Sequence, residues 1–238
     1  MNFEQGEILY IDKPYTWTSF NLVAKIRRLL CEKMGVKKLK VGHAGTLDPL
    51  ATGVMIICTG RSTKKIEELQ SGTKEYVATL KLGATTPSYD LEKPIDATYP
   101  TDHITQSLID KVLPKFVGRI EQVPPAFSAC KVNGKRAYDL ARKGKDVELK
   151  PKILVIDEIK QLSFQPKAME LTLRIICSKG TYIRALARDI GQALESGAHL
   201  ISLRRTQVGP VRVEDCMSIE DFPQWLAQQE IEHLTENQ

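Results

Sequence analysis

The segment VGHAGTLDPLATGVMIICTGRSTK, residues 41–64, decides the fold and contains the strongest candidate for a reactive side chain. In its glycine-rich first half, Asp48 stands directly before a proline. The apolar run from Val54 to Cys58 follows and predicts a buried strand. A carboxylate on a tight turn beside a rigid strand is well placed to act as a nucleophile. Neither a Ser–His pair nor a cluster of metal ligands accompanies it in the sequence, so Asp48 itself is the candidate.

Helix and strand patterns surround this segment without strict alternation. Apolar residues at helical spacing after Thr18 and Ser19 predict a helix that ends near Met34. Residues 74–82 alternate between polar and apolar side chains, as in a half-buried strand. We expect further strands at 7–12, 153–164, 168–178 and 198–208, and further helices at 62–70 (capped by Ser62), 105–116, 180–197 and after a capping box at 218–221. This mixture favours an α+β (mixed α/β) fold around one sheet.

The composition is that of an ordinary globular chain of 238 residues, enough for one large domain or two small ones. The five cysteines are scattered without CxxC spacing, which argues for a reducing compartment and against a zinc site. The histidines also lack metal-ligand spacing. Neither a signal peptide nor an apolar stretch of the ~20 residues that cross a bilayer is visible. We therefore expect a cytoplasmic protein without a membrane segment or a metal.

Positive charge is concentrated before residue 213. Residues 1–212 contain 34 basic and 22 acidic side chains, whereas residues 213–238 contain seven acids and neither Lys nor Arg. The segment 118–152 is polar, basic and interrupted by Pro and Gly, so we expect a mobile surface element with a short helix near 137–142. A body this basic favours a polyanion such as nucleic acid, although a solvated surface would have the same composition.

Five segments, taken in order, resemble the TruB family of tRNA pseudouridine synthases. They are GHAGTLDPLATG at 42–53, KEYVATLKLG at 74–83, PPAFSACK at 124–131, CSKGTYIRALARDIG at 177–191 and GAHLISLRR at 197–205. The resemblance implies the family's catalytic fold, a curved and mostly antiparallel central sheet flanked by helices, over residues 1–212. It also implies that the enzyme flips uridine 55 out of the TΨC loop of tRNA and isomerises it, with the basic insertion closing over the T-arm.

The reaction needs a carboxylate independently of the family name. The N1–C1′ bond breaks, the uracil turns and C5 joins C1′, so neither a redox cofactor nor a metal is implied. A carboxylate can attack the ribose, attack the pyrimidine ring or stabilise a cationic sugar, and the sequence leaves these routes open. By resemblance, Asp48 is the nucleophile, and Arg184 opposes the rise in pKa that burial causes in a carboxyl group. An ordinary Asp-Pro turn in solvent is the alternative reading of Asp48.

The resemblance also implies a substrate pocket. Tyr76 stacks on the flipped uracil, Tyr182 and Leu203 line the pocket, and His43 contacts RNA near the displaced nucleotide. By residue type alone, the two tyrosines and the leucine fit equally well in a hydrophobic core. Four basic residues are candidates for contact with RNA phosphates: Lys64, Lys131, Arg204 and Arg205. For each of them, the alternative is a solvated charge on the surface. The implied partner is the T-arm of tRNA, and we expect a monomer without an obligate protein partner.

The match departs from the family pattern in two places. Many relatives continue into a PUA-type RNA-binding domain, whereas here we expect an acidic C-terminal tail at 213–238 with a short helix and no such domain. Thr16 stands where the family has glycine in KP-x-G-x-TS, which alters a turn. Two other functions stay open at this point. One is a non-catalytic tRNA-binding protein that uses the same cleft. The other is an RNA glycosidase, which would normally need a second catalytic carboxylate; by residue type, Asp90 is the nearest candidate.

Overall fold

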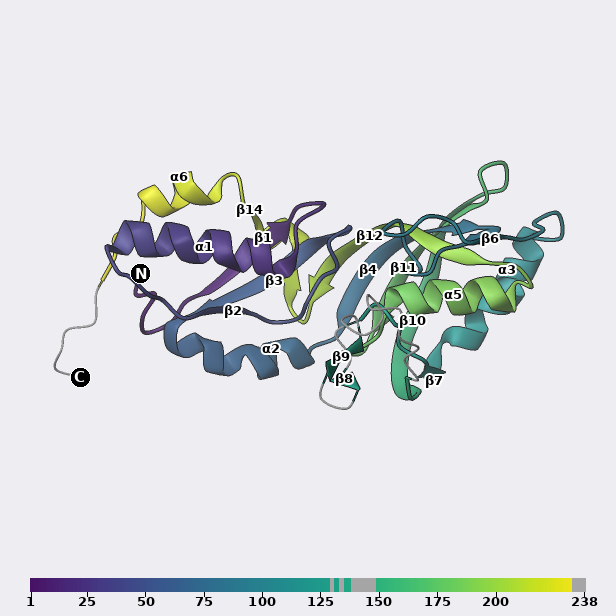
Figure 1. Ribbon diagram of the computed structural model, residues 1–238, viewed down its shortest axis with the longest axis horizontal. Helices are drawn as coiled ribbons and strands as arrows, with labels where there is room; N and C mark the ends of the chain where they lie inside the picture. Colours follow the sequence, from purple (N-terminus) through teal and green to yellow (C-terminus); the bar gives the residue numbers. More distant parts are fainter. Residues whose placement is uncertain (129–130, 133–134, 138–148, 233–238) are drawn as a thin grey trace. The chain divides into compact units, whose positions relative to one another are not determined.

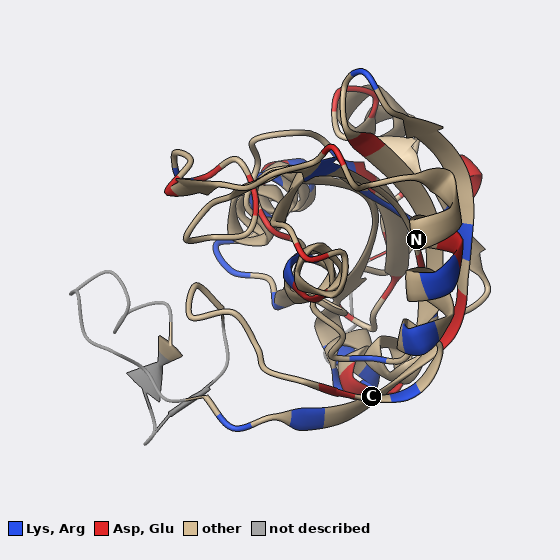
Figure 2. Cartoon of the chain, turned by 90° about the vertical axis from the view of Figure 1, so that its right-hand side faces the viewer, with Lys and Arg blue, Asp and Glu red and all other residues tan. Residues whose placement is uncertain are grey.

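The computed structural model describes residues 1–128, 131–132, 135–137 and 149–232 (Figure 1). The chain forms two compact units, one from residues 1–74 with 204–238 and the other from residues 75–203. Lys and Arg are interspersed with Asp and Glu along both helices and strands (Figure 2). Among the described residues, no helix is both long and apolar enough to span a membrane.

The first unit is built on the buried strand that the sequence predicts. β3 (Ala51–Thr59) pairs antiparallel with β1 (Ile8–Lys13) on one side and with β2 (Val41–His43) at its end. β14 (Met217–Ser218) adds a parallel edge to β1. In the same unit β13 (Val211–Arg212) pairs antiparallel with the end of β12 (Ala198–Val208), the strand that begins in the second unit.

Helix α1 (Ser19–Met34) covers this part of the sheet because its apolar residues fall on one face. Thr18 caps it by accepting a hydrogen bond from the Asn21 N–H, and Gly35 ends it in the left-handed region, as a helix C-terminus favours. α6 (Phe222–Ala227) packs on the same core. Buried members of this core are Leu22, Ile26, Leu30, Ile11, Met55, Ile57, Phe222 and Leu226.

Two expected helix starts in the first unit were wrong. Ser62 does not cap a helix, because it lies inside the 3-10 helix η1 (Gly60–Lys65), which leads into α2 (Ile66–Ser71). At 218–221, Ser218 Oγ accepts the Asp221 N–H as a capping box would, but this closes a turn before α6. The helix itself is preceded by Asp221.

In the second unit the strand order is β4, β11, β10, β7, and β10 pairs antiparallel with both β11 and β7. These strands are β4 (Lys74–Leu82), β11 (Glu170–Cys177), β10 (Lys152–Gln165) and β7 (Gly118–Gln122). Ile159 of β10 lies opposite Ile175, and Leu154 lies opposite Ile120. Helix α3 (Gln106–Val112), the 3-10 helix η2 (Leu113–Phe116) and helix α5 (Ile183–Ala193) complete it. Two separate pairs of two-residue strands lie outside the large sheet: β5 (Ala84–Thr85) pairs with β6 (Ala97–Thr98), and β8 (Lys131–Val132) pairs with β9 (Lys135–Arg136).

The expected fold class is confirmed: helices accompany a large, mostly antiparallel sheet. Two details differ. The sequence missed β7, whose short run GRIEQ has only one strongly apolar residue. Helix α5 begins at Ile183 instead of Gly180, because Gly180 has φ of 83° and Thr181 Oγ1 donates to the Ser178 carbonyl in a turn. The helix expected near 137–142 falls almost wholly outside the described residues.

Candidate active site

Asp48 lies on the loop between β2 and β3 in the first unit. The N–H of Ala51 donates to the carbonyl of Asp48 at 3.0 Å, which closes a turn with Pro49 at its second position. The side chain is half-buried, so it does not stand fully in solvent as a simple surface Asp-Pro turn would. The turn thus presents a carboxylate at the start of the most buried strand of the unit.

Lys13, at the end of β1, supports one side of this turn. Its side chain is fully buried, and its ammonium donates to the carbonyls of Pro14, Trp17 and Pro49 at 2.9, 2.6 and 3.3 Å. Burial lowers the pKa of Lys13 to about 8, an effect that the negative charge of Asp48 opposes. The residue therefore places a positive charge near Asp48 while tying down the residue that follows it.

Ser19, the first residue of α1, supports the other side. The N–H of Leu47 donates to Ser19 Oγ at 2.9 Å, and Ser19 Oγ donates to the Leu47 carbonyl at 3.0 Å. Both groups are buried. The residues immediately before and after Asp48 are therefore fixed by side chains from α1 and β1.

Arg205 supports the start of the same loop and is not placed as a phosphate contact. Its side chain is 1% exposed, and its guanidinium donates to the carbonyls of Val54 at 2.7 and 2.9 Å and of Gly45 at 3.1 Å. A buried guanidinium that spends its donors on carbonyls is structural. The expectation that Arg205 contacts phosphate is corrected accordingly.

Arg204 and Lys64 differ from this buried arginine. Arg204 is partly exposed and forms a two-point ion pair with Asp12, with N–O distances of 2.7 and 3.2 Å. Lys64 is exposed on η1, where its ammonium faces solvent. Both positions are accessible to RNA, and their phosphate contacts stay predictions.

His43 ends β2 and lies on the approach to the loop. Burial lowers its pKa below the usual value and the charge of Arg205 lowers it further, whereas a hydrogen bond from the ring to the backbone of Gly45 raises it. The lowered pKa favours the neutral form of the imidazole. Within the described residues, its buried Nδ1 has no hydrogen-bond partner.

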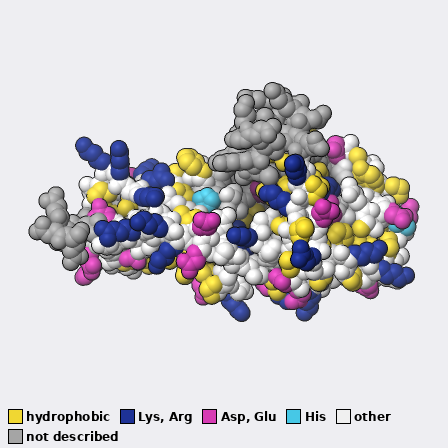
Figure 3. Space-filling view, turned by 90° about the horizontal axis from the view of Figure 1, so that it is seen from below, with side chains coloured by type: hydrophobic (Ala, Val, Ile, Leu, Met, Phe, Trp, Pro, Cys, Tyr) yellow, Lys and Arg dark blue, Asp and Glu magenta, His cyan; other side chains and the backbone are white. Residues whose placement is uncertain are grey.

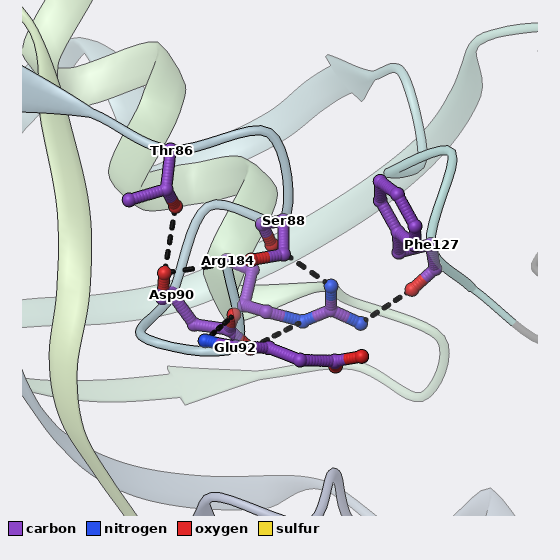
Figure 4. Close-up of polar contacts among 6 residues, drawn as sticks. All are labelled: Thr86, Ser88, Asp90, Glu92, Phe127 and Arg184. Atoms are coloured by element: carbon purple, nitrogen blue, oxygen red, sulfur yellow. Dashed lines mark hydrogen bonds and ion pairs between the residues drawn. The ribbon is translucent and has the colours of Figure 1, made fainter. Parts of the chain in front are cut away.

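Arg184 lies in the second unit, on the first turn of α5, and its guanidinium is held on three sides (Figure 4). Nη1 donates to the Ser88 carbonyl at 3.0 Å and Nη2 donates to the Phe127 carbonyl at 2.8 Å. Nε lies 3.8 Å from Oδ2 of Asp90, and both side chains are buried. Asp90, which the sequence offers as a second carboxylate for a glycosidase, thus forms an ion pair with Arg184 in this unit.

Tyr182 precedes Arg184 and is held by its backbone. The side-chain amide of Gln122, a buried residue of β7, accepts the Tyr182 N–H at 3.0 Å and donates to the Tyr182 carbonyl at 3.2 Å. This two-point contact fixes the start of α5. The phenol ring itself is half-buried.

The remaining expected residues also belong to the second unit. Tyr76 is 8% exposed and lies on the buried face of β4 with Ala78 and Leu80. Leu203 is half-buried on β12. Lys131 begins β8. Because Asp48 and Arg184 belong to different units, the pairing of these two residues stays a prediction.

Sequence reasoning missed the supporting roles of four residues: Lys13, Ser19, Asp90 and Gln122. From the sequence, Ser19 is only a candidate helix cap and Asp90 only a candidate second carboxylate for a glycosidase. Lys13 ends strand β1 directly before Pro14. Nothing local distinguishes Gln122, whose partner is 60 residues away.

The chain matches two family models. The one described as TruB family pseudouridylate synthase (N terminal domain) covers residues 31–183, and the one described as tRNA pseudouridylate synthase B C-terminal domain covers residues 184–236. A protein of Phocaeicola vulgatus named tRNA pseudouridine synthase B is 70% identical over 98% of this chain and 99% of that protein. A protein of Bacteroides thetaiotaomicron with the same name is 66% identical over the whole of both.

Solved structures share the fold. A chain of a crystallised Cbf5-Nop10-Gar1 complex superposes with a TM-score of 0.71 and 28% identity over 94% of this chain. A chain of the archaeal box H/ACA sRNP Nop10-Cbf5 complex gives a TM-score of 0.67 and 26% identity. This chain spans 55% of the length of each.

Proposed function

The chain belongs to the TruB family of pseudouridine synthases, and from this we propose that it isomerises uridine 55 in the TΨC loop of tRNA. It is an isomerase that converts uridine to pseudouridine in tRNA. The observation that carries this function is the 70% identity, over 98% of the chain, to a protein named tRNA pseudouridine synthase B. The position in the tRNA is the part that rests on the proposal.

Asp48 is the proposed nucleophile. Its support is the way the turn is fixed: Ser19 holds the residue before it, and Lys13 holds the residue after it. A side chain that must meet a sugar or a pyrimidine ring needs such preorganisation, because a misplacement of about 1 Å can cost 100-fold in rate. The ammonium of Lys13 also favours the ionised form of a nearby carboxylate.

Arg184 is proposed to keep the nucleophile oriented, with Tyr76 stacking on the displaced uracil. Tyr182, Leu203 and His43 complete the pocket in this proposal. Support for the role of Arg184 comes from its buried guanidinium, whose position is fixed by two carbonyls and by Asp90. A cation fixed in this way can stabilise charge without reorganising during the reaction.

The substrate also indicates the partner and the place of action. The partner is tRNA, held through its T-arm, with Lys64, Lys131 and Arg204 in contact with phosphates. We propose that the enzyme works as a monomer in the cytoplasm, where tRNA is found. We propose that residues 1–212 form the catalytic domain, with the insertion 118–152 as the RNA clamp. Residues 213–238 follow as an acidic C-terminal tail.

The test uses an unmodified tRNA transcript and the purified protein. Carbodiimide adducts that resist alkali mark pseudouridine, and we expect one site, in the T loop. Asp48→Asn should lower turnover at least about 1,000-fold, which corresponds to about 4 kcal/mol of barrier, with RNA affinity nearly unchanged. Asp102→Asn, on an exposed loop, is the matched control.

Three outcomes would contradict the proposal. Unimpaired turnover in Asp48→Asn would indicate that another group is the nucleophile. Tight binding without any pseudouridine would indicate a non-catalytic RNA-binding protein. Release of free uracil would indicate a glycosidase.

A further inference from the structure

A concentration of exposed positive charge lies in the first unit, away from the proposed nucleophile. Between Glu32 and Glu67 the sequence contains only one acid, Asp48. In the same interval, exposed bases lie on the loop after α1 and on η1. They are Lys37, Lys38, Lys40, Arg61, Lys64 and Lys65, and we name them the basic cluster.

The fold brings the two halves of this cluster together. The Gly60 N–H donates to the Lys40 carbonyl at 2.8 Å, and Val41 lies opposite Thr59 where β2 pairs with β3. The loop after α1 therefore runs beside the start of η1. In the space-filling view, Lys and Arg side chains gather at the left of the face shown (Figure 3).

The bases of the cluster are not paired with carboxylates in the described part of the chain. Among the described residues, the ion pairs of the structure involve none of its six members. A depression of about 380 Å³ next to it is lined by Arg27, Arg28 and Lys37, with Glu32 as its one acid. Six like charges that form no ion pairs in the described part of the chain repel one another, and a bound polyanion relieves that repulsion.

The position of the cluster separates it from the reacting uridine. Asp48 lies at the beginning of β3, and the cluster lies at its end, next to Gly60. At about 3.3 Å per residue, the nine residues of β3 span up to about 26 Å. A phosphate at the cluster thus belongs to a nucleotide several steps away from the flipped base.

We propose that the basic cluster is a second RNA-backbone site, which binds phosphates of the tRNA remote from the target loop. This inference rests on the proposed function for the identity of the RNA. It adds five residues to Lys64, which is already a candidate for phosphate contact. The contacts set affinity and orientation and do not read sequence, since phosphate contacts carry no base information.

The test is the triple variant Lys37→Gln, Lys38→Gln, Arg61→Gln, none of which touches the proposed pocket. Its matched control, Lys111→Gln, Lys115→Gln, Lys160→Gln, removes the same charge from exposed positions of the second unit. Each lost phosphate contact lowers the slope of log K against log salt by about 0.7–0.9, so the cluster variant should lose about 2. We expect its Kd and KM for full-length tRNA to rise at least tenfold near 0.1 M salt, and those of the control to change less than twofold.

Two results would overturn the inference. One is an unchanged Kd and an unchanged salt slope in the cluster variant. This result would mean that the cluster does not bind tRNA and that it serves another partner, such as an acidic protein. The other is an equal loss in the control, which would indicate long-range net charge instead of a site. Thermal unfolding checks that both variants fold. Failure of the proposed function is distinguishable, because it would show as absent pseudouridine in the wild type whatever the Kd values are.

Discussion

The two units fix their principal charged side chains in different ways. In the first unit, the described bonds hold the backbone on both sides of Asp48, through Ser19 and Lys13. In the second unit, the described bonds hold the guanidinium of Arg184 itself, through two carbonyls and Asp90. The described bonds of the first unit thus fix the turn that carries Asp48, and those of the second unit fix the guanidinium of Arg184.

From this comparison we expect that substitutions of the supporting residues in the first unit mainly lower the stability of the fold. Arg205→Met should have the largest effect, because the carbonyls of Val54 and Gly45 would lose buried donors. We expect the free energy of unfolding to fall by about 3 kcal/mol. For a chain of this size the melting temperature should then fall by roughly 6–12 °C, measured by circular dichroism.

The neighbouring arginine is the control for this prediction. Arg204→Met removes a partly exposed ion pair with Asp12, so it should cost less than about 1 kcal/mol. Equal losses in the two variants would contradict the structural role that burial gives to Arg205.

Damage to the second unit should instead appear mainly in catalysis. Asp90→Asn keeps the shape of the side chain but removes the charge beside Arg184. We expect kcat to fall about tenfold, equivalent to about 1.4 kcal/mol, with KM within twofold. Asp96→Asn, in the same loop but exposed, should leave both constants unchanged. A fall in melting temperature without a fall in kcat would mean that Asp90 only stabilises the fold.

The elements of the fold could be predicted because their signals are local. The helix after Thr18 and the alternating strand 74–82 follow from spacing and capping within a few residues. The supporting contacts could not be predicted, because Arg205 and Val54 are 151 residues apart and Gln122 and Tyr182 are 60 apart. Such pairs become visible only when strands are placed next to each other.

One signal for the buried arginine was nevertheless present in the sequence. Successive side chains of a strand point to opposite faces, so of two adjacent arginines in 198–208 only one can face solvent. The structure buries Arg205 and leaves Arg204 partly exposed. The pairing of Asp48 with Arg184 rests on the family motifs, since no local pattern connects the two residues.

The titration of Lys13 sharpens the comparison, because the ammonium of Lys13 supports the turn of Asp48 in the first unit. With a pKa of about 8 in the folded chain, Lys13 loses its charge above pH 8, and we expect turnover to fall three- to fivefold by pH 9. The free energy of unfolding should not fall together with turnover. The unfolded chain binds the proton up to about pH 10.4, so between these values the contribution of Lys13 to stability rises with pH.

The measurement is a pH profile of kcat/KM with melting temperatures over the same range. Lys13→Arg stays charged throughout, so its profile should lack the decline near pH 8 if the variant folds. The same decline in both proteins would assign it to another group.

The smallest expected effect concerns the turn that Lys13 holds. Thr16 lies between the acceptor residues Pro14 and Trp17 and has φ of 69°, a left-handed conformation that is strained for a β-branched residue. Thr16→Gly relieves this strain but increases the freedom of the unfolded chain, so we expect a net gain of about 0.5–1 kcal/mol in unfolding free energy. Turnover should stay within twofold, because the turn keeps its geometry. A loss of stability measured by denaturant unfolding would show that the Thr16 side chain, and not only its backbone, supports the loop of Asp48.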